Sequence, residues 1–159
     1  MRVIRATLAY DGTDFVGWQV RAAGRSVQGV LQHGLARMHG HPVRVVGAGR
    51  TDSGVHATGQ VASFLSDIDS IPGPRFRDAV NAYLPHDVRV VESGEAPPGF
   101  HARRSATMRV YRYYTVAAPV LLPHLRRYRH WVRRGLDLDR LRAMAGVIAG
   151  EHDFTSFTA

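Results

Sequence analysis

The pattern of apolar and polar positions predicts four β-strands in the first part of the chain. Apolar side chains at every second position are typical of a strand with one buried face. In residues 3–10, for example, Ile4, Ala6 and Leu8 fall on one face and Arg5 on the other. The strands are expected at residues 3–10, 43–48, 59–65 and 88–91.

Two helices are predicted between these strands. Ser26 is a favourable N-cap, and apolar side chains then recur at helical spacing as far as Gly40. A second helical pattern covers residues 75–84, which follow Pro74 and end before Pro85. The resulting order, β-α-β-β-α-β, is the ferredoxin-like arrangement, an antiparallel α+β sheet domain that RNA-recognition modules (RRM-like domains) also use.

A proline- and glycine-rich segment, residues 95–99, marks the boundary of a second domain. We therefore expect a first domain at residues 1–95 and the incomplete start of a second α+β domain at residues 96–159. The second part is expected to contain an aromatic-rich strand at residues 107–116, a strand at residues 128–132, and a helix from Asp137 or Asp139 to Gly150. The helix is expected to bury its apolar positions, which are Leu138, Leu141, Met144, Ala145 and Ile148.

The composition adds a large positive charge to this picture. The chain has 159 residues, a net charge of +8 and a pI of about 10.9, and all 21 of its lysine-or-arginine positions hold arginine. This balance favours a polyanionic partner, above all a nucleic acid, since arginine makes planar two-point contacts with phosphate. A GC-rich genome is a second explanation for the absence of lysine, but it does not explain the excess of cations over anions.

The same composition excludes several classes of protein. A hydrophobic content of 45% is typical of a packed globular chain and not of a disordered one. No apolar run reaches membrane-spanning length, and residues 1–5 lack the layout of a signal peptide. Because there is no cysteine, disulfides and thiolate metal sites are excluded. We therefore expect a cytoplasmic protein.

The most informative segment is the glycine-rich loop after the second expected strand. Residues 47–57 read GAGRTDSGVHA, with Asp52 two positions after Arg50. Glycine lets the backbone approach a ligand closely, and a spacing of two places both side chains on one face of an extended backbone. Such a loop presents a carboxylate, kept ionised by an adjacent guanidinium, to a large polar substrate. An ordinary turn is the alternative, because Asp, Ser and Gly are common turn residues.

Residues 50–57, RTDSGVHA, resemble the catalytic loop of the TruA family of tRNA pseudouridine synthases. The string is long and unusual, and further segments resemble other motifs of the family in the same order along the chain. They are YDGT at residues 10–13, F at residue 15, GWQ at residues 17–19, VQ at residues 27–28, FHAR at residues 100–103, SA at residues 105–106, YRY at residues 111–113 and GEHDFTSF at residues 150–157. The resemblance covers nearly the whole chain.

This resemblance implies a function, a site and an architecture. Family members isomerise uridines to pseudouridine in the anticodon arm of tRNA, as homodimers and without a cofactor or a metal. By resemblance, Asp52 is the catalytic aspartate, Arg50 is the arginine that pairs with it, and Tyr111 stacks on the target uracil. The pseudouridine synthase fold has a second domain similar to the first, and members continue for roughly another hundred residues, which completes that domain. The chain is therefore expected to be truncated in its second domain.

The residue types suit this chemistry. Cleavage of the glycosidic bond develops positive charge on the ribose, which a carboxylate such as Asp52 can stabilise or attack, as glycosidase carboxylates do. The target base must first leave its stack, and stacking on Tyr111 offsets part of that cost by roughly 1–3 kcal/mol. A core aromatic on a sheet is the alternative for Tyr111. The later arginines either follow phosphates or form a solvated face. They are Arg103, Arg104, Arg109, Arg112, Arg126, Arg127, Arg129, Arg133 and Arg134.

An RNA-binding module and a hydrolase are the alternative functions. The ferredoxin-like order and the basic charge also fit a truncated, catalytically incompetent RNA-binding module. A hydrolase built on Asp52 and His56 is disfavoured, because no serine elbow or oxyanion motif accompanies them, and His56 is expected to hold the loop in place. His33, His39 and His41 lie close in sequence without the acid spacing of a zinc site, so no metal is expected.

Overall fold

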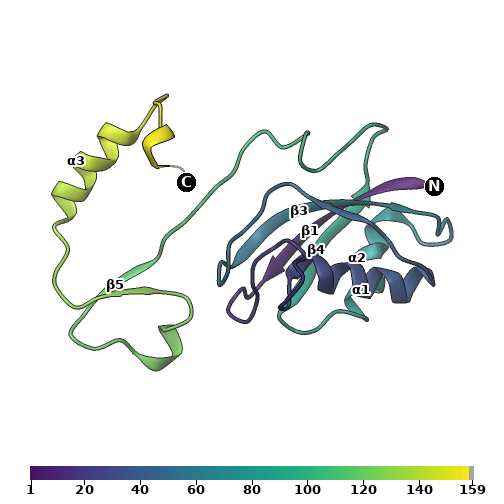
Figure 1. The fold of residues 1–159 in the computed structure, drawn as a ribbon, viewed down its shortest axis with the longest axis horizontal. Coiled ribbons are helices and arrows are strands. Elements are labelled where there is room, and N and C mark those ends of the chain that lie inside the picture. The colour runs from purple at the N-terminus through teal and green to yellow at the C-terminus, as the bar shows by residue number, and fades with distance from the viewer. Residues whose placement is uncertain (158–159) are drawn as a thin grey trace. The chain divides into compact units, whose positions relative to one another are not determined.

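The computed structural model describes residues 1–157 of the protein. The chain forms two compact units, Met1–Arg109 and Val110–Ala159. Each unit has its own hydrogen-bonded sheet, with four strands in the first unit and two in the second (Figure 1).

The first unit has the predicted order β-α-β-β-α-β. Its strands and α-helices are β1 (Arg2–Tyr10), α1 (Val27–His39), β2 (Val45–Gly47), β3 (Ala57–Ser66), α2 (Phe76–Asn81) and β4 (Val88–Glu95). The sheet order is β2-β3-β1-β4, and every neighbouring pair is antiparallel. Helices α1 and α2 contact each other beside the sheet, as Figure 1 shows. The α+β class and the antiparallel sheet that the sequence predicts are thus confirmed.

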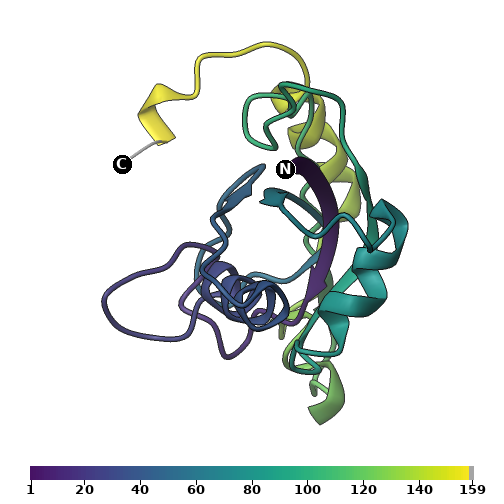
Figure 2. The ribbon, with the colours of Figure 1, turned by 90° about the vertical axis from the view of Figure 1, so that its right-hand side faces the viewer.

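Strand β1 lies at the centre of the sheet and alternates as the sequence predicts. Ile4, Leu8 and Tyr10 are buried, whereas Arg5 reaches the surface and pairs with Glu92 at 2.9 Å. Figure 2 looks along α1 and shows β1 passing beside the helix. The buried face of β1 and the apolar stripe of α1 therefore share one core. The helix contributes Val27, Leu31 and Leu35 to it.

Helix α1 begins and ends at the residues that the sequence indicates. At its N-terminus, Ser26 Oγ accepts a hydrogen bond from Gly29 N–H at 3.2 Å. At its C-terminus, Gly40 has a φ of 76° and donates its N–H to Ala36 O at 2.9 Å. A side-chain acceptor before the first turn and a left-handed glycine after the last turn are the usual helix caps, so local chemistry sets both bounds.

Helix α2 is shorter than the predicted helix of residues 75–84. A 3-10 turn, η1 (Gly73–Arg75), comes first, and α2 ends at Asn81. The Asn81 side chain binds both backbone groups of Val90 in β4, with Nδ2 2.8 Å from Val90 O and Oδ1 2.9 Å from Val90 N. The predicted length was wrong because apolar spacing does not record this hydrogen bonding to the sheet.

The segment that follows β4 still packs on the sheet of the first unit. Ala96 N–H donates to Val3 O in β1 at 2.9 Å. Ala102 is buried and donates its N–H to Ser63 Oγ in β3 at 3.2 Å. The domain boundary predicted from proline and glycine content thus lies at the end of β4, while the compact unit extends further, to Arg109.

The second unit contains a small parallel sheet and one α-helix. Strand β5 (Thr115–Ala117) pairs with β6 (His130–Val132), and α3 (Leu138–Ile148) follows. The side chain of Asp137 caps α3 by accepting from Arg140 N–H at 2.9 Å. The strand predicted at residues 128–132 is confirmed as β6. The helix start predicted at Asp137 is also confirmed.

Two predictions for the later part of the chain were wrong. Of the aromatic-rich strand predicted at residues 107–116, only residues 115–116 are in a strand, at the start of β5. A ladder needs a partner, and β6, the partner in the described part of the second unit, pairs only with Thr115–Ala117. The apolar positions of α3 are exposed, since nothing in the described part of that unit covers them. Like every helix in residues 1–157, α3 lacks the length and apolar character that crossing a bilayer requires.

Candidate active site

Asp52 lies in the loop between β2 and β3, where the sequence predicts it. Val55 N–H donates to Asp52 O at 3.2 Å and closes a tight turn over residues 52–55, called the Asp52 turn below. Gly54, in the third position, has a φ of 77°, the left-handed backbone that a type II turn requires there. The side chains of Arg50 and Asp52 are both exposed. The turn therefore presents its carboxylate to solvent.

The residue before Asp52 is bound by the last residue of β1 and by the segment between β1 and α1. The Thr51 hydroxyl shares a hydrogen bond of 2.9 Å with Tyr10 OH, and Thr51 O accepts from Trp18 N–H at 2.9 Å. Trp18 is itself buried, and a Cβ on Gly47 would lie 2.5 Å from its indole ring. The backbone just before Asp52 is therefore held next to the buried Trp18.

The residues after Asp52 are bound by the same segment. Phe15 O accepts from Ser53 Oγ at 3.1 Å and from Gly54 N–H at 3.3 Å. The Phe15 ring is buried in the core, so this carbonyl has little freedom to move. The backbone is thus held on both sides of Asp52 while the carboxylate stays accessible.

Two glycines allow the two segments to approach this closely. A Cβ on Gly12 would lie 2.1 Å from Val55 O, and one on Gly17 would lie 2.7 Å from Thr51 O. Gly17 also has a φ of 113°, which other residues rarely adopt. Sequence reasoning included these glycines only through the family resemblance. Apart from the resemblance, the sequence offered one signal of a close approach. Gly12 and Gly17 lie on either side of the aromatic residue Phe15 in a segment rich in turn residues.

We expect Gly12→Ala to destabilise the first unit and to displace the Asp52 turn. Its methyl group would meet a backbone carbonyl, which cannot rotate away, and overpacking of this kind costs about 1–3 kcal/mol. Urea unfolding measures the loss. Gly59→Ala is the matched control, because nothing lies within 4 Å of a Cβ built on that glycine. Equal unfolding midpoints for the two variants would contradict the close approach.

His56 holds the far end of the loop, in agreement with its predicted role. Its Nδ1 accepts from Gly12 N–H at 3.1 Å and lies 3.1 Å from Asp11 Oδ1. The same oxygen of Asp11 accepts from the N–H and the hydroxyl of Thr13, at 3.0 and 2.6 Å. His56 therefore connects the loop between β2 and β3 to the start of the segment between β1 and α1.

The predicted partnership of Arg50 and Asp52 is not visible as an ion pair. No salt bridge joins these two side chains in the part of the chain that the structure describes. The backbone next to Arg50 is held instead by Gln60, whose Nε2 donates to Gly49 O at 2.8 Å. The Arg50 side chain itself is exposed.

The tyrosines of the second unit are exposed. Tyr111, Tyr113 and Tyr114 are 63%, 91% and 53% exposed, respectively. The Arg129 guanidinium carbon lies 4.4 Å from the ring centroid of Tyr114. Within the residues that the structure describes, Tyr111 is not part of a buried core. Exposed tyrosines beside arginines are typical of surfaces on which nucleic-acid bases stack.

An ion pair lies next to the Phe15 ring. Arg25 binds Asp87 at two points, with Nη1 2.5 Å from Oδ2 and Nη2 2.9 Å from Oδ1. The hydrogen bond from Arg25 lowers the pKa of Asp87, and the same bond raises the pKa of Arg25. Sequence reasoning did not identify this pair, because its members are 62 positions apart.

We expect the Arg25–Asp87 pair to contribute to the acid dependence of stability. A carboxyl whose pKa is lowered by folding stabilises the fold above its unfolded pKa of about 3.9, and this contribution disappears as the pH falls through the folded value. As the pH falls from about 5 to about 3, the free energy of unfolding of the Asp87→Asn variant should therefore decrease less than that of the wild type. Denaturant unfolding at several pH values measures this. Asp69→Asn, at an exposed site, is the control and should follow the wild type.

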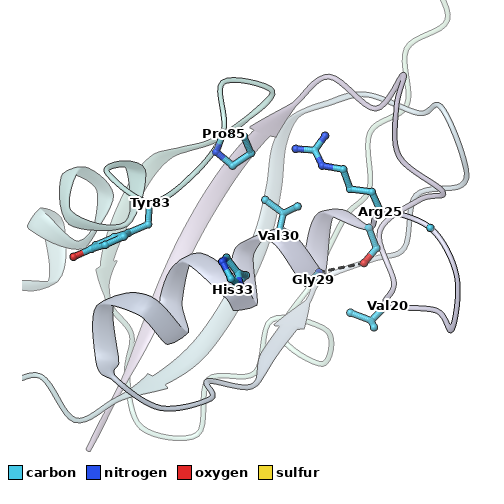
Figure 3. A pocket seen from close by; sticks show the side chains of 9 residues that line it. Val20, Arg25, Gly29, Val30, His33, Tyr83 and Pro85 are labelled. Atoms are coloured by element: carbon cyan, nitrogen blue, oxygen red, sulfur yellow. Dashed lines mark hydrogen bonds between the residues drawn. The ribbon is translucent and has the colours of Figure 1, made fainter.

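A pocket of about 420 Å³ lies beside α1 in the first unit (Figure 3). Asp52 is not part of its wall, so the pocket provides no geometry for chemistry at that carboxylate. Its larger side chains are those of Val20, Arg25, Val30, His33, Tyr83 and Pro85.

The histidines near the end of α1 have structural contacts. His39 Nδ1 lies 2.8 Å from Leu35 O, and its Nε2 lies 2.9 Å from Ser66 Oγ. His41 Nε2 lies 2.9 Å from Asp67 Oδ2. Within residues 1–157, no group of three or more His, Asp or Glu side chains is arranged to hold a metal ion.

Most of the sheet, the segment between β1 and α1 and the Asp52 turn all fall within one family match. A family model described as tRNA pseudouridine synthase matches residues 6–103, which is more than half of the chain. The chain belongs to the tRNA pseudouridine synthase family.

Curated relatives carry the name tRNA pseudouridine synthase A. The protein from Ruminiclostridium cellulolyticum is 44% identical over 159 residues, which are 100% of this chain and 64% of that protein. The protein from Solidesulfovibrio magneticus is 49% identical over 163 residues, covering 99% of this chain and 59% of that protein. The protein from Treponema denticola is 41% identical over 161 residues, covering 98% and 60%. The chain is homologous to these isomerases and spans about three fifths of their length.

Proposed function

We propose that this protein isomerises uridine to pseudouridine in the anticodon arm of tRNA, with Asp52 as its catalytic carboxylate. The Asp52 turn carries the proposal, because its backbone is held on both sides while its carboxylate is exposed. A group that must reach the ribose of a flipped nucleotide needs both a rigid backbone and an open approach. Membership of the family supports the same reaction.

Asp52 acts at the anomeric carbon of the target uridine. The bond from this carbon to N1 of the base breaks, and the carboxylate stabilises or attacks the positive carbon that results. The base then turns, and its C5 forms the new bond to the same carbon. C5 loses a proton and N1 gains one, so the product is an isomer of the substrate and no oxidant or second substrate is consumed.

Arg50 and Tyr111 handle the flipped nucleotide in this proposal. The exposed Arg50 guanidinium lies two positions before Asp52 and can bind a phosphate at two points. The exposed Tyr111 ring offers a stacking surface for the uracil, worth roughly 1–3 kcal/mol.

The polyanion favoured by the net charge of +8 is tRNA in this proposal. The first unit serves as a ferredoxin-like domain, and the second unit is part of a similar domain that completes the uracil pocket. The whole protein acts as a homodimer in the cytoplasm, without a cofactor.

A second candidate is a tRNA-binding module that does not turn over its substrate. It is favoured by the ferredoxin-like order of the first unit, which RNA-recognition modules share, and by the net charge of +8.

Incubation of the purified chain with an unmodified tRNA transcript separates the two candidates. Carbodiimide mapping or mass spectrometry detects pseudouridine, and a gel-shift assay detects binding. Pseudouridine in the anticodon arm supports the synthase, and binding without product supports the binding module. A chain that neither binds nor modifies tRNA overturns both. A transcript with cytidine in place of the anticodon-arm uridines is the matched control.

A further inference from the structure

We propose that Arg25, Asp87 and Phe15 form a brace that positions the Asp52 turn for catalysis. In this proposal none of the three touches the reacting nucleotide, and they act through the backbone of the turn. Their effect on the turn depends only on the geometry of the first unit. Their effect on turnover rests on the proposed function.

Arg25 is held in one place by two kinds of contact. It binds the Asp87 carboxylate at two points, and its guanidinium carbon lies 4.2 Å from the ring centroid of Phe15. Figure 3 shows its side chain extending toward the loop of Pro85, which is the loop that carries Asp87. A planar guanidinium that is paired at its edge and stacked on its face has little rotational freedom.

Phe15 transmits this restraint to the turn. Its ring lies under the Arg25 guanidinium, and its carbonyl accepts hydrogen bonds from Ser53 Oγ and Gly54 N–H. These two residues directly follow Asp52. A shift of Phe15 would therefore move the catalytic carboxylate.

A second connection runs from the same ion pair to the turn through the backbone. Asp87 O accepts from Asp11 N–H at 3.0 Å. The next residue, Gly12, is the glycine whose Cβ position lies 2.1 Å from Val55 O. Arg25 O also accepts from Val16 N–H at 2.9 Å. The backbone carbonyls of the two paired residues therefore hold both ends of residues 11–16, the segment that contacts the turn.

Local hydrogen exchange tests the brace on the chain itself, without any need for turnover. Asp87→Asn is expected to raise the exchange rate of the Gly54 amide by roughly tenfold, while the amides of β1 keep their protection. Asp67→Asn is the matched control, because it breaks the ion pair of His41 with Asp67, which lies just beyond the opposite end of β3. Gly54 exchange equal to that of the control would overturn the brace.

Two further variants separate a specific brace from a general loss of stability. Arg25→Lys keeps the charge but loses the two-point contact and the stacking, so it should raise Gly54 exchange as Asp87→Asn does. The double variant should show no more exchange than either single variant, because each one already breaks the same pair. Additive effects, or equal loss of protection across the whole sheet, would contradict the proposal.

Kinetics test the consequence for the reaction. For Asp87→Asn we expect kcat to fall roughly tenfold and KM for tRNA to stay within about twofold, since a misplaced carboxylate affects the reaction and not the binding of RNA. A raised KM with unchanged kcat would place the pair in an RNA-binding surface and overturn the positioning role. If the wild-type chain forms no pseudouridine, the proposed function fails and the exchange measurement alone decides the brace.

Discussion

Asp52→Asn is expected to slow pseudouridine formation by at least about 10³-fold and to leave tRNA binding nearly unchanged. The amide keeps the shape of the carboxylate but has no negative charge, so it neither stabilises the positive ribose carbon nor attacks it. Folding should be unaffected, because the side chain is exposed and the contacts that hold the turn come from its neighbours. Single-turnover assays give the rate, and a gel-shift assay gives the affinity.

Asp69→Asn is the matched control for this change. Asp69 is also an exposed aspartate of the first unit, but it follows β3 rather than preceding it. It should keep the wild-type rate. A wild-type rate in Asp52→Asn would remove Asp52 from the chemistry, and a large loss of tRNA affinity would give it a binding role instead.

Phe76→Ala is expected to lower the free energy of unfolding of the first unit by about 3–5 kcal/mol. Phe76 is 1% exposed, and its ring centroid lies 6.0 Å from that of Phe64 and 6.3 Å from that of His39. Removing the ring leaves a cavity where α2 meets the sheet. Since whole domains are stable by only about 5–15 kcal/mol, this loss is a large fraction of the total. Unfolding in guanidinium chloride measures it.

Leu65→Ala is the control for Phe76→Ala. Leu65 lies on β3 next to Phe64 but is 56% exposed, so its truncation leaves no cavity. We expect a change of less than about 1 kcal/mol. A similar small change for Phe76→Ala would show that the core near α2 rearranges to fill the space.

The elements of the first unit could be predicted because their signals are local. Alternation in β1 and the caps of α1 at Ser26 and Gly40 depend on residues within a few positions of each other. The errors arose where distant residues decide the outcome. Asn81 ends α2 by binding β4, and residues 110–114 do not join a strand because the described part of the second unit provides no partner for them.

The candidate site shows the same division. The position of Asp52 between two strands followed from the apolar pattern of those strands, and the exposure of its side chain followed from the glycine-rich loop. The partners that hold the turn did not follow from the pattern. Ser53 and Phe15 are 38 positions apart, and no local periodicity links a hydroxyl in one loop to a carbonyl in another.

The sequence by itself determined the order of the elements up to Glu95, the basic charge, and the motifs that mark the family, because each is encoded in neighbouring residues or in composition. Only the tertiary structure decided how the Asp52 turn is held. Backbone hydrogen bonds, the close approach at Gly12, and the stacking of Arg25 on Phe15 arise when segments far apart in the chain meet. Such contacts depend on how whole helices and strands are placed relative to one another. The residues next to a given position in the sequence do not specify that placement.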